Sequence, residues 1–186
     1  MQTDGDSGNF CLSDGERILP ISKHCCMIAD FIAFDGNDKR FANKLIQHIQ
    51  TLLQSNLQTS YYEALGRMAA LLDCVQAETD FALDYDAEDC ASGILKALRV
   101  RLSDDGTLLE QLVNFMRASA ELLQIRHFVF VSLKSLLNDQ DLALLYRQAR
   151  LEEWSLLLIE QVAKPKIESE RHYILDRDLC EIVVPE

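Results

Sequence analysis

Proline, glycine and long apolar runs are all scarce in this chain of 186 residues. It contains 3 Pro and 7 Gly, and its composition is 48% hydrophobic and 26% charged. These proportions exclude collagen-like, low-complexity and disordered chains. No apolar run approaches the roughly 18 to 20 residues that a membrane-spanning helix needs. The composition therefore predicts an ordinary globular protein, either one domain or one domain split into two lobes.

Targeting signals and cysteine motifs are also missing. The first six residues, Met-Gln-Thr-Asp-Gly-Asp, are acidic and polar, whereas a secretory signal would be basic and then apolar. The 6 cysteines include no Cys-x-x-Cys pair, which argues against a zinc knuckle or a redox site. We therefore expect a cytoplasmic protein with no membrane partner.

The common phosphate-binding and catalytic motifs do not occur either. The sequence has neither Gly-x-x-x-x-Gly-Lys-Ser/Thr nor Gly-x-Gly-x-x-Gly, and it has no Gly-x-Ser-x-Gly. ATP or NAD binding by those routes and serine hydrolase chemistry are thus disfavoured. The 4 histidines are scattered at positions 24, 48, 127 and 172, and each is interpreted as a surface or structural residue. The sequence therefore offers no catalytic site of these common types.

Positive charge is in short supply. With 18 Lys and Arg against 30 Asp and Glu, the formal net charge is −12. Such a surface repels polyanions, so any contact with nucleic acid would need a local basic patch.

The first third of the chain shows alternating signals for strands and helices. Residues 10–12 and 17–19 flank an Asp-Gly turn and predict a β-hairpin. The mostly apolar residues 25–34 predict a buried strand that stops at Asp-Gly-Asn-Asp. Apolar residues then recur every three or four positions, which predicts a helix over 37–54 and a second over about 61–81. The apolar stripe of the second helix would be Leu65, Met68, Leu72 and Val75.

The second half of the chain contains the clearest signal for the start of a helix. Thr107 and Glu110 have the spacing of a capping box, which predicts a helix from there to about residue 124. Residues 127–132 are β-branched and aromatic and predict a central strand. Asn138 can cap a further helix that reaches Leu151, and a strand follows over 154–160. This strand-helix-strand order predicts a right-handed crossover between parallel strands.

The ends of the chain thus carry α/β signals and the middle carries only helical ones. We predict an α/β fold in which residues 8–36 and 123–186 form a discontinuous head. Its mainly parallel sheet would be flanked by helices. Residues 37–122 would form an all-helical leg inserted into the head.

One dense acidic stretch lies in the predicted leg. Six carboxylates occur within a dozen residues with no Lys or Arg among them, at Glu78, Asp80, Asp84, Asp86, Glu88 and Asp89. Two carboxylates about 4 Å apart repel by roughly 4 kcal/mol at an effective dielectric of 20, so the stretch is either fully solvated or holds a cation. Excess oxygen ligands suit Ca²⁺. A two-metal site for phosphodiester cleavage is a further alternative.

Basic residues form a second, modest signal in the same region. They are Lys39, Arg40 and Lys44 at the start of the first long helix, and Arg99 and Arg101 near residue 100. On sequence alone they are either partners of neighbouring acids at the surface or a patch for phosphate groups.

An ordered series of short motifs runs along the chain from about residue 10 to the end. In the first half these segments are residues 12–14, 30–35, 83–86 (Leu-Asp-Tyr-Asp) and 95–102. In the second half they are residues 127–132 (His-Phe-Val-Phe-Val-Ser), 136–142, 156–160 and 172–179. Taken in this order, the segments resemble the CRISPR-associated spacer-acquisition protein of type II-A loci.

The resemblance implies a non-enzymatic protein with an α/β head and a helical leg. Members of this family assemble as calcium-stabilised homotetrameric rings that bind the free ends of double-stranded DNA. They act with the integrase and the effector nuclease of the same CRISPR locus. Because the acidic stretch matches the family's calcium-binding region, the resemblance makes Glu78, Asp80, Asp84, Asp86 and Glu88 the expected Ca²⁺ ligands.

The five basic residues of the leg become the expected DNA contacts. They would contact the phosphate backbone of DNA, and such contacts do not depend on the base sequence.

Two other functions stay open at this stage. One is a metal-dependent nuclease or phosphohydrolase that uses the carboxylates of residues 78–89. The other is a helical protein-interaction module without DNA contact, for which the net charge of −12 is the main argument.

Overall fold

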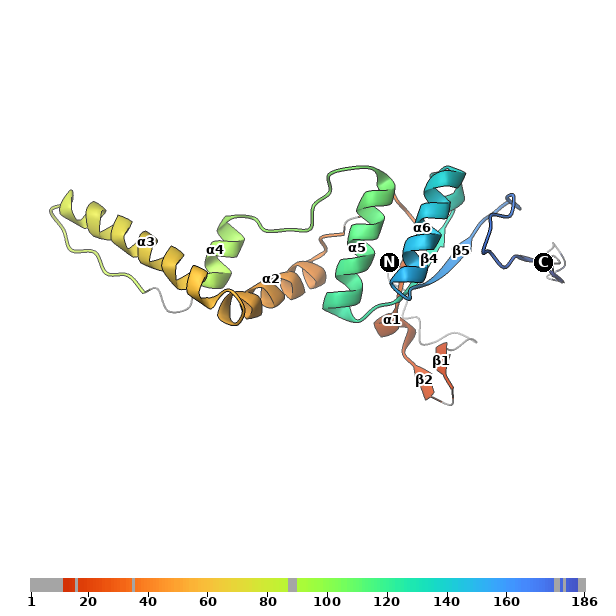
Figure 1. Cartoon of the computed structure of the whole chain (residues 1–186), viewed down its shortest axis with the longest axis horizontal. Coiled ribbons are helices and arrows are strands. Elements are labelled where there is room, and N and C mark those ends of the chain that lie inside the picture. Colours follow the sequence, from red (N-terminus) through yellow and green to blue (C-terminus); the bar gives the residue numbers. More distant parts are fainter. Residues whose placement is uncertain are drawn as a thin grey trace. The chain divides into compact units, whose positions relative to one another are not determined.

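The computed structural model describes residues 12–15, 17–34, 36–86, 90–175, 178 and 180–183. Contacts divide the chain into two compact units. The first, here called the α/β unit, comprises Met1–Gly36 and Ser103–Glu186, and the second, the helical unit, is Asn37–Leu102. The helical unit is thus an insertion in the sequence of the α/β unit, as the colour order in Figure 1 shows.

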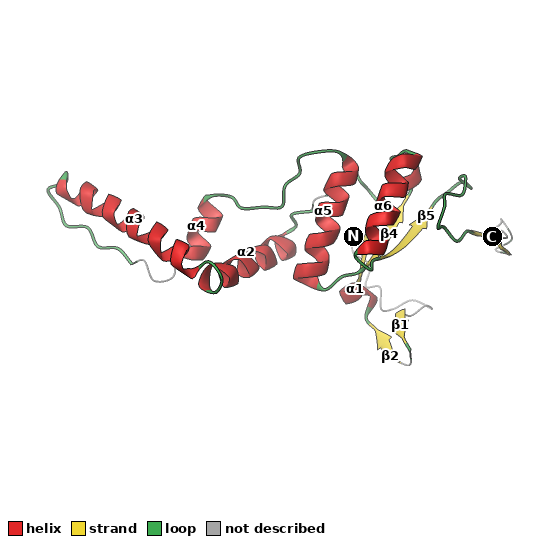
Figure 2. Ribbon diagram, in the orientation of Figure 1, coloured by secondary structure: helices red, strands yellow, loops and turns green. Residues whose placement is uncertain are grey.

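A three-stranded parallel sheet organises the α/β unit. Its strands are β3 (Cys25–Ile28), β4 (His127–Val131) and β5 (Ser155–Ile159), in the order β3-β4-β5. Both pairings are parallel, and Phe128 of β4 aligns with Cys26 and Leu156. The prediction of a central strand with a parallel neighbour is therefore confirmed, as is the α/β fold class (Figure 2).

Two helices connect these strands, namely α5 (Leu108–Leu123) before β4 and α6 (Asp139–Leu151) before β5. The strands follow one another across the sheet, and parallel crossovers are right-handed, so both helices belong on the same face. Phe128 and Phe130 of β4 are fully buried, as are Leu112 of α5 and Leu145 of α6. The core of the α/β unit therefore lies between these helices and the sheet.

The opposite face of the sheet is more open in the described structure. Met27, Val129 and Leu157 align across the three strands, and alternation along each strand places them away from Phe128 and Phe130. Met27 and Leu157 are 61% and 55% exposed. Parallel sheets are usually covered on both faces, so this one-sided coverage is unusual.

The helix starts follow the chemistry of their first residues. At α5, the Thr107 hydroxyl accepts from the Glu110 amide, and the Glu110 carboxylate accepts from the Thr107 amide at 2.7 Å. At α6, the Asn138 side chain accepts from the Asp141 amide at 2.9 Å. Both predicted caps are confirmed, because each side chain satisfies an amide that has no partner inside its helix.

Short elements complete the α/β unit. Strands β1 (Leu12–Asp14) and β2 (Arg17–Leu19) form the predicted hairpin, with Gly15 at a positive φ of 60°. Helix α1 (Ile21–His24) leads into β3, and the 3-10 helix η1 (Leu133–Ser135) follows β4. Strands β6 (Tyr173–Leu175) and β7 (Glu181–Val183) form a second antiparallel pair near the C-terminus.

The helical unit consists of α2 (Lys39–Gln54), α3 (Gln58–Ala77) and α4 (Ala91–Ala97). Its described buried apolar side chains are Phe41, Leu65, Ala91 and Leu95. Both predicted long helices are present, although α3 lies three or four residues closer to the N-terminus than predicted. None of the described helices is long and apolar enough to cross a membrane.

The structure differs from the sequence interpretation in two places. The strand predicted over 25–34 ends at Ile28, because the Asp30 carboxylate accepts from the amides of Ile32 and Ala33 and turns the chain. The boundary of the insertion is residue 102 rather than 122. Helix α5 belongs to the α/β unit, where Phe115 packs edge-on against Phe34 at 4.9 Å. Residues 8–11 of the predicted head lie outside the described part.

Candidate functional site

One asparagine joins the two ends of the helical unit. The Asn37 side-chain amide donates to the Leu102 carbonyl at 3.1 Å, and the Leu102 amide donates to the Asn37 side-chain oxygen at 2.7 Å. The two residues are 65 positions apart in sequence. This two-bond clasp therefore places the start of α2 beside the segment that follows α4.

The clasp brings together the basic residues that the sequence singled out. Lys39 and Arg40 lie in the first turn of α2 and Lys44 in the next, while Arg99 and Arg101 lie just before Leu102. All five residues are exposed. Two groups that are separate in sequence are thus brought to the same end of the helical unit.

The start of α2 has an unusual charge distribution. Its first turn contains no acidic residue, and Asp38 caps it by accepting from the Phe41 amide at 2.8 Å. The N-terminus of a helix is itself the positive end of the helix dipole, so Lys39 and Arg40 each reduce helix stability by about 0.3–1 kcal/mol. The same arrangement concentrates positive potential where a phosphate group is favoured.

Arg99 occupies a conformation that is unusual for its residue type. It follows α4 with a φ of 53°, in the left-handed region. Its amide donates to the Lys96 carbonyl, and the Val100 amide donates to the Leu95 carbonyl, both at 3.0 Å. Glycine is the usual residue at such a helix end, and a larger residue costs about 1 kcal/mol there.

The described part of the acidic stretch, residues 78–86, is here called the acidic segment, and it turns back along the helix α3 that precedes it. Gln76 of α3 donates to the Phe81 carbonyl at 2.8 Å, and its side-chain oxygen accepts from the Leu83 amide. The Tyr85 hydroxyl donates to Asp73 at 3.3 Å. Desolvation, followed by the neighbouring Asp73 carboxylate, raises the pKa of Tyr85. Two side chains of α3 thus hold the segment by its backbone and by Tyr85.

The predicted calcium ligands are placed along this segment. Glu78 directly follows α3 as its C-cap, and Asp80, Asp84 and Asp86 come after it in exposed positions. Glu88 lies outside the described residues. Throughout the described part of the chain, no three carboxylate, histidine or cysteine side chains lie close enough together to hold a metal ion. Because Ca²⁺ takes six to eight oxygens, the described carboxylates of one chain do not by themselves form a complete calcium site, nor a two-metal hydrolytic site.

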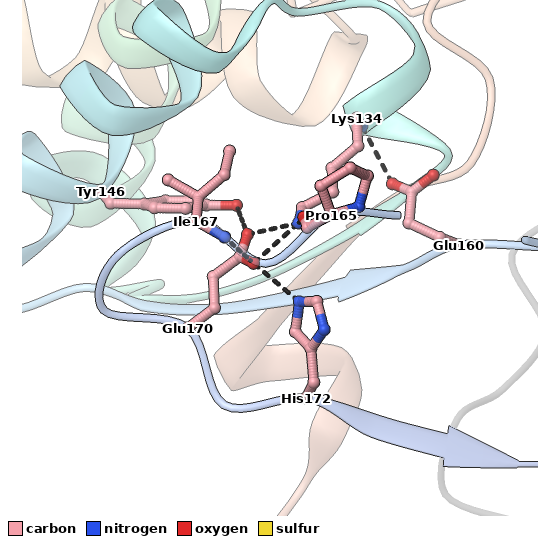
Figure 3. Close-up of polar contacts among 7 residues, drawn as sticks. All are labelled: Lys134, Tyr146, Glu160, Pro165, Ile167, Glu170 and His172. Carbon is pink, nitrogen blue, oxygen red and sulfur yellow. Dashed lines mark hydrogen bonds and ion pairs between the residues drawn. The ribbon is translucent and has the colours of Figure 1, made fainter. Parts of the chain in front are cut away.

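A polar cluster that the sequence interpretation missed lies in the α/β unit (Figure 3). Its centre is the Glu170 carboxylate, which lies 2.7 Å from Lys134 Nζ and 2.7 Å from His172 Nε2. It also accepts from the Tyr146 hydroxyl and, at 2.9 Å, from the Ile167 amide. The Lys134 and Glu170 side chains are only 6% and 10% exposed. Four donors therefore converge on one carboxylate that is almost inaccessible to solvent.

The electrostatics of the cluster depend on these bonds. Burial raises the pKa of Glu170, but the bonds from the Ile167 amide, Lys134, Tyr146 and His172 outweigh it and lower the pKa to about 2. Burial and the Glu170 carboxylate raise the pKa of Tyr146 well above its ordinary value. At neutral pH the carboxylate is therefore ionised and the phenol is protonated and donating.

Part of this cluster had a signal in the sequence. Lys134 follows the end of β4 closely and Glu160 directly follows β5, and the carboxyl ends of neighbouring parallel strands meet at one edge of a sheet. The Lys134 amide donates to the Glu160 carboxylate at 2.9 Å. Tyr146 lies near the middle of α6, and Glu170 and His172 lie well beyond the end of β5, so none of the three shows such a positional signal.

Comparison with known proteins identifies a family. The family described as CRISPR-associated protein (Cas_Csn2) matches residues 2–179. Among curated proteins, none matches the chain in sequence. A solved structure titled "Crystal structure of Stu0660 of Streptococcus thermophilus" is similar at 11% identity and a TM-score of 0.46, over 82% of this chain and 51% of that chain. The present chain thus spans about half the length of that structure. From the match of residues 2–179, the chain belongs to the Cas_Csn2 family, the spacer-acquisition family that its motifs resemble.

Proposed function

We propose that this chain is a non-catalytic protein that binds double-stranded DNA during CRISPR spacer acquisition, preferentially at free ends and without sequence preference. The observation that carries the proposal is the basic end of the helical unit, where the Asn37 clasp brings two groups of exposed cations together. In a chain with a net charge of −12, such a local concentration is what contact with a polyanion needs.

The residue types favour contacts to the phosphate backbone. Lys and Arg bind phosphates as point charges or as forks, and contacts of this kind position the DNA without reading its bases. The helix N-terminus adds its dipole to Lys39 and Arg40. We assign the DNA contacts to Lys39, Arg40, Lys44, Arg99 and Arg101, and we assign no reaction to the protein.

Assembly and calcium form the second part of the proposal. By its family resemblance, the chain forms a homotetrameric ring that Ca²⁺ stabilises, and it acts with the integrase and effector nuclease of its locus. Glu78, Asp80, Asp84 and Asp86 supply oxygen ligands from the acidic segment. The remaining oxygens would come from the sequence around Glu88 or from a second copy of the chain.

DNA-end binding is tested by titrating the purified chain with a fluorescent linear duplex. Unlabelled linear DNA and a closed circle of the same sequence serve as competitors. We expect affinity that falls steeply with salt, and more effective competition by the linear form. Absence of salt-sensitive binding, or equal competition by the circle, would contradict the proposal in its DNA or its end-binding part respectively.

The calcium assignment is tested by the mass of the chain in solution, measured by light scattering with Ca²⁺ and then with chelator. We expect a tetramer that loosens on chelation. The double variant Asp84→Asn/Asp86→Asn should loosen in the presence of Ca²⁺, whereas Glu63→Gln/Glu153→Gln, which removes two exposed carboxylates elsewhere, should not. A mass that is unaffected by both chelation and the first variant would refute the assignment.

A further inference from the structure

The polar cluster around Glu170 occupies a part of the fold where ligands commonly bind. Lys134 lies in η1, which follows the carboxyl end of β4, and Glu160 follows the carboxyl end of β5. In α/β proteins with parallel strands, ligands bind at this edge of the sheet. In the present structure the Glu170 side chain of the protein itself lies at this edge, beside Lys134 (Figure 3).

The donors around Glu170 are those of an anion site. An ammonium group, a phenol, an imidazole and a backbone amide all point at the same two oxygens, with Lys134 Nζ and His172 Nε2 each at 2.7 Å. Lys134 Nζ also donates to the Pro165 carbonyl at 3.0 Å. A lysine that is only 6% exposed needs an anion beside it, because an uncompensated buried charge costs several kcal/mol.

The anion beside Lys134 is the Glu170 carboxylate, which belongs to a loop and not to the core. We call residues 161–172 the strap. Within it, Ser169 has a left-handed φ of 77°, and its hydroxyl accepts from the Arg150 side chain of α6. The strap therefore reaches the cluster through a turn in which Ser169 has an unfavourable backbone conformation. Arg150 of α6 holds this turn through its hydrogen bond to Ser169.

The strap is also locally basic in an acidic protein. It carries Lys164, Lys166 and Arg171 against Glu168 and Glu170. Lys166 and Arg171 are exposed and Lys164 is partly so. Removal of the Glu170 carboxylate would leave Lys134 without its anion and the strap with three cations against the single carboxylate of Glu168.

We propose that this cluster is an anion site that Glu170 fills from within, and that a phosphate-type oxyanion enters it by displacing the Glu170 carboxylate. The donors supply what phosphate oxygens need, namely a charged ammonium and neutral N–H and O–H groups. The tethered carboxylate competes with the ligand through its effective concentration, which is in the millimolar range or higher for short connections. This inference does not depend on DNA binding by the helical unit.

The test is a calorimetric titration of the full chain with inorganic phosphate at constant ionic strength, with chloride as the balancing anion. Glu170→Gln keeps the size of the side chain but removes its charge, and we expect it to bind phosphate at least about tenfold more tightly than the original chain. The matched control is Glu168→Gln, an exposed carboxylate in the same strap, which should leave the affinity unchanged.

The location of binding is read from histidine side-chain NMR signals. Phosphate should move the signal of His172, which contacts Glu170, and leave that of His48 in the helical unit unmoved. Equal affinity in the original chain and Glu170→Gln, absence of binding in both, or binding without a change at His172 would overturn the proposal.

A second variant keeps the test decisive if Glu170→Gln does not fold. Glu170→Asp retains the charge and shortens its reach by one methylene, so phosphate should bind more tightly than in the original chain but less tightly than to an uncharged variant. An unchanged affinity would count against the anion site.

The source of the anion is distinguished by titrating the chain with a duplex that carries 5′-phosphates and with the same duplex without them. Tighter binding of the phosphorylated form assigns the site to DNA ends, and equal binding assigns it to free phosphate.

Discussion

The two units of this chain differ in how their side chains are used. In the α/β unit, Phe128, Phe130, Leu112 and Leu145 are fully buried between the helices and the sheet. In the helical unit, α3 is 20 residues long, yet Leu65 is its one buried side chain among the described residues. The first unit has a conventional core, and the second presents most of its surface to solvent.

The difference indicates which unit carries stability and which carries contacts. Met68, Leu72 and Val75 continue the apolar stripe of α3 beyond Leu65, and they are 49%, 37% and 42% exposed. The exposed cations and the acidic segment lie on the same unit. By contrast, the polar cluster of the α/β unit is turned inward and bonded to itself. We infer that substitutions should mainly affect stability in the α/β unit and mainly affect binding in the helical unit.

The largest effect is expected from a cavity in the core of the α/β unit. Phe130→Ala removes a fully buried ring from the central strand and should lower the free energy of unfolding by about 3–5 kcal/mol. Val75→Ala, in the exposed stripe of α3, should change it by less than about 0.5 kcal/mol. Urea unfolding of both variants at a fixed protein concentration measures this contrast. Similar losses would mean that α3 is buried in the solution state.

Acid should destabilise the α/β unit through Glu170. Its pKa in the folded chain is about 2, against an ordinary value of 4.5. Because the folded-state value is the lower one, the stabilising contribution is complete above about pH 4.5 and is lost as the pH falls towards 2. Unfolding measured between pH 6 and pH 3 should show a smaller loss in Glu170→Gln than in the original chain. An identical pH dependence in the two proteins would contradict this assignment.

The clasp should link stability and binding in the helical unit. Asn37→Ala removes two hydrogen bonds to Leu102 and leaves that backbone unpaired, which should cost about 1–3 kcal/mol. Because the clasp aligns the two basic groups, DNA affinity should fall as well, although no cation is lost. Hydrogen exchange of the Leu102 amide and a DNA titration measure both effects. Unchanged affinity with a lost clasp would show that the alignment is unimportant.

The smallest expected change in stability has the opposite sign. Arg99→Gly relieves a left-handed conformation at the end of α4 and should stabilise the helical unit by up to about 1 kcal/mol. DNA binding should nevertheless weaken, because a cation is removed. Thermal unfolding and a DNA titration of the same preparation measure the two signs. Joint improvement or joint loss would argue against a binding role for Arg99.

Local signals predicted the elements, and topology decided what they bring together. The caps at Thr107 and Asn138 were predictable because each involves residues three positions apart. The length of β3 was not predictable, because residues 25–34 form an apolar run that is typical of a strand, and the turn at Asp30 interrupts it. Helix α5 was recognised as a helix, but its amphipathic pattern does not tell whether it packs on the sheet or on other helices.

The candidate sites show the same limit. Charge patterning identified the basic residues, whereas only the structure shows that Asn37 joins their two groups across 65 positions. The acidic segment was visible as a run of carboxylates, but its return along α3 depends on Gln76 and Asp73. The contacts of Glu170 could not be predicted from the sequence, because its partners come from three separate segments, namely η1, α6 and the strap.

The most direct test of the central claim compares two triple variants in their salt-dependent binding to linear duplex DNA. Lys39→Ala/Arg40→Ala/Lys44→Ala removes three cations from the basic end of the helical unit. Lys23→Ala/Arg126→Ala/Arg147→Ala removes three exposed cations from the α/β unit. We predict that the first variant weakens binding for all sequences alike and reduces the salt slope by about 2–3, while the second leaves the slope unchanged. Equal slopes in the original chain and the first variant would place the DNA contact elsewhere and contradict the assignment.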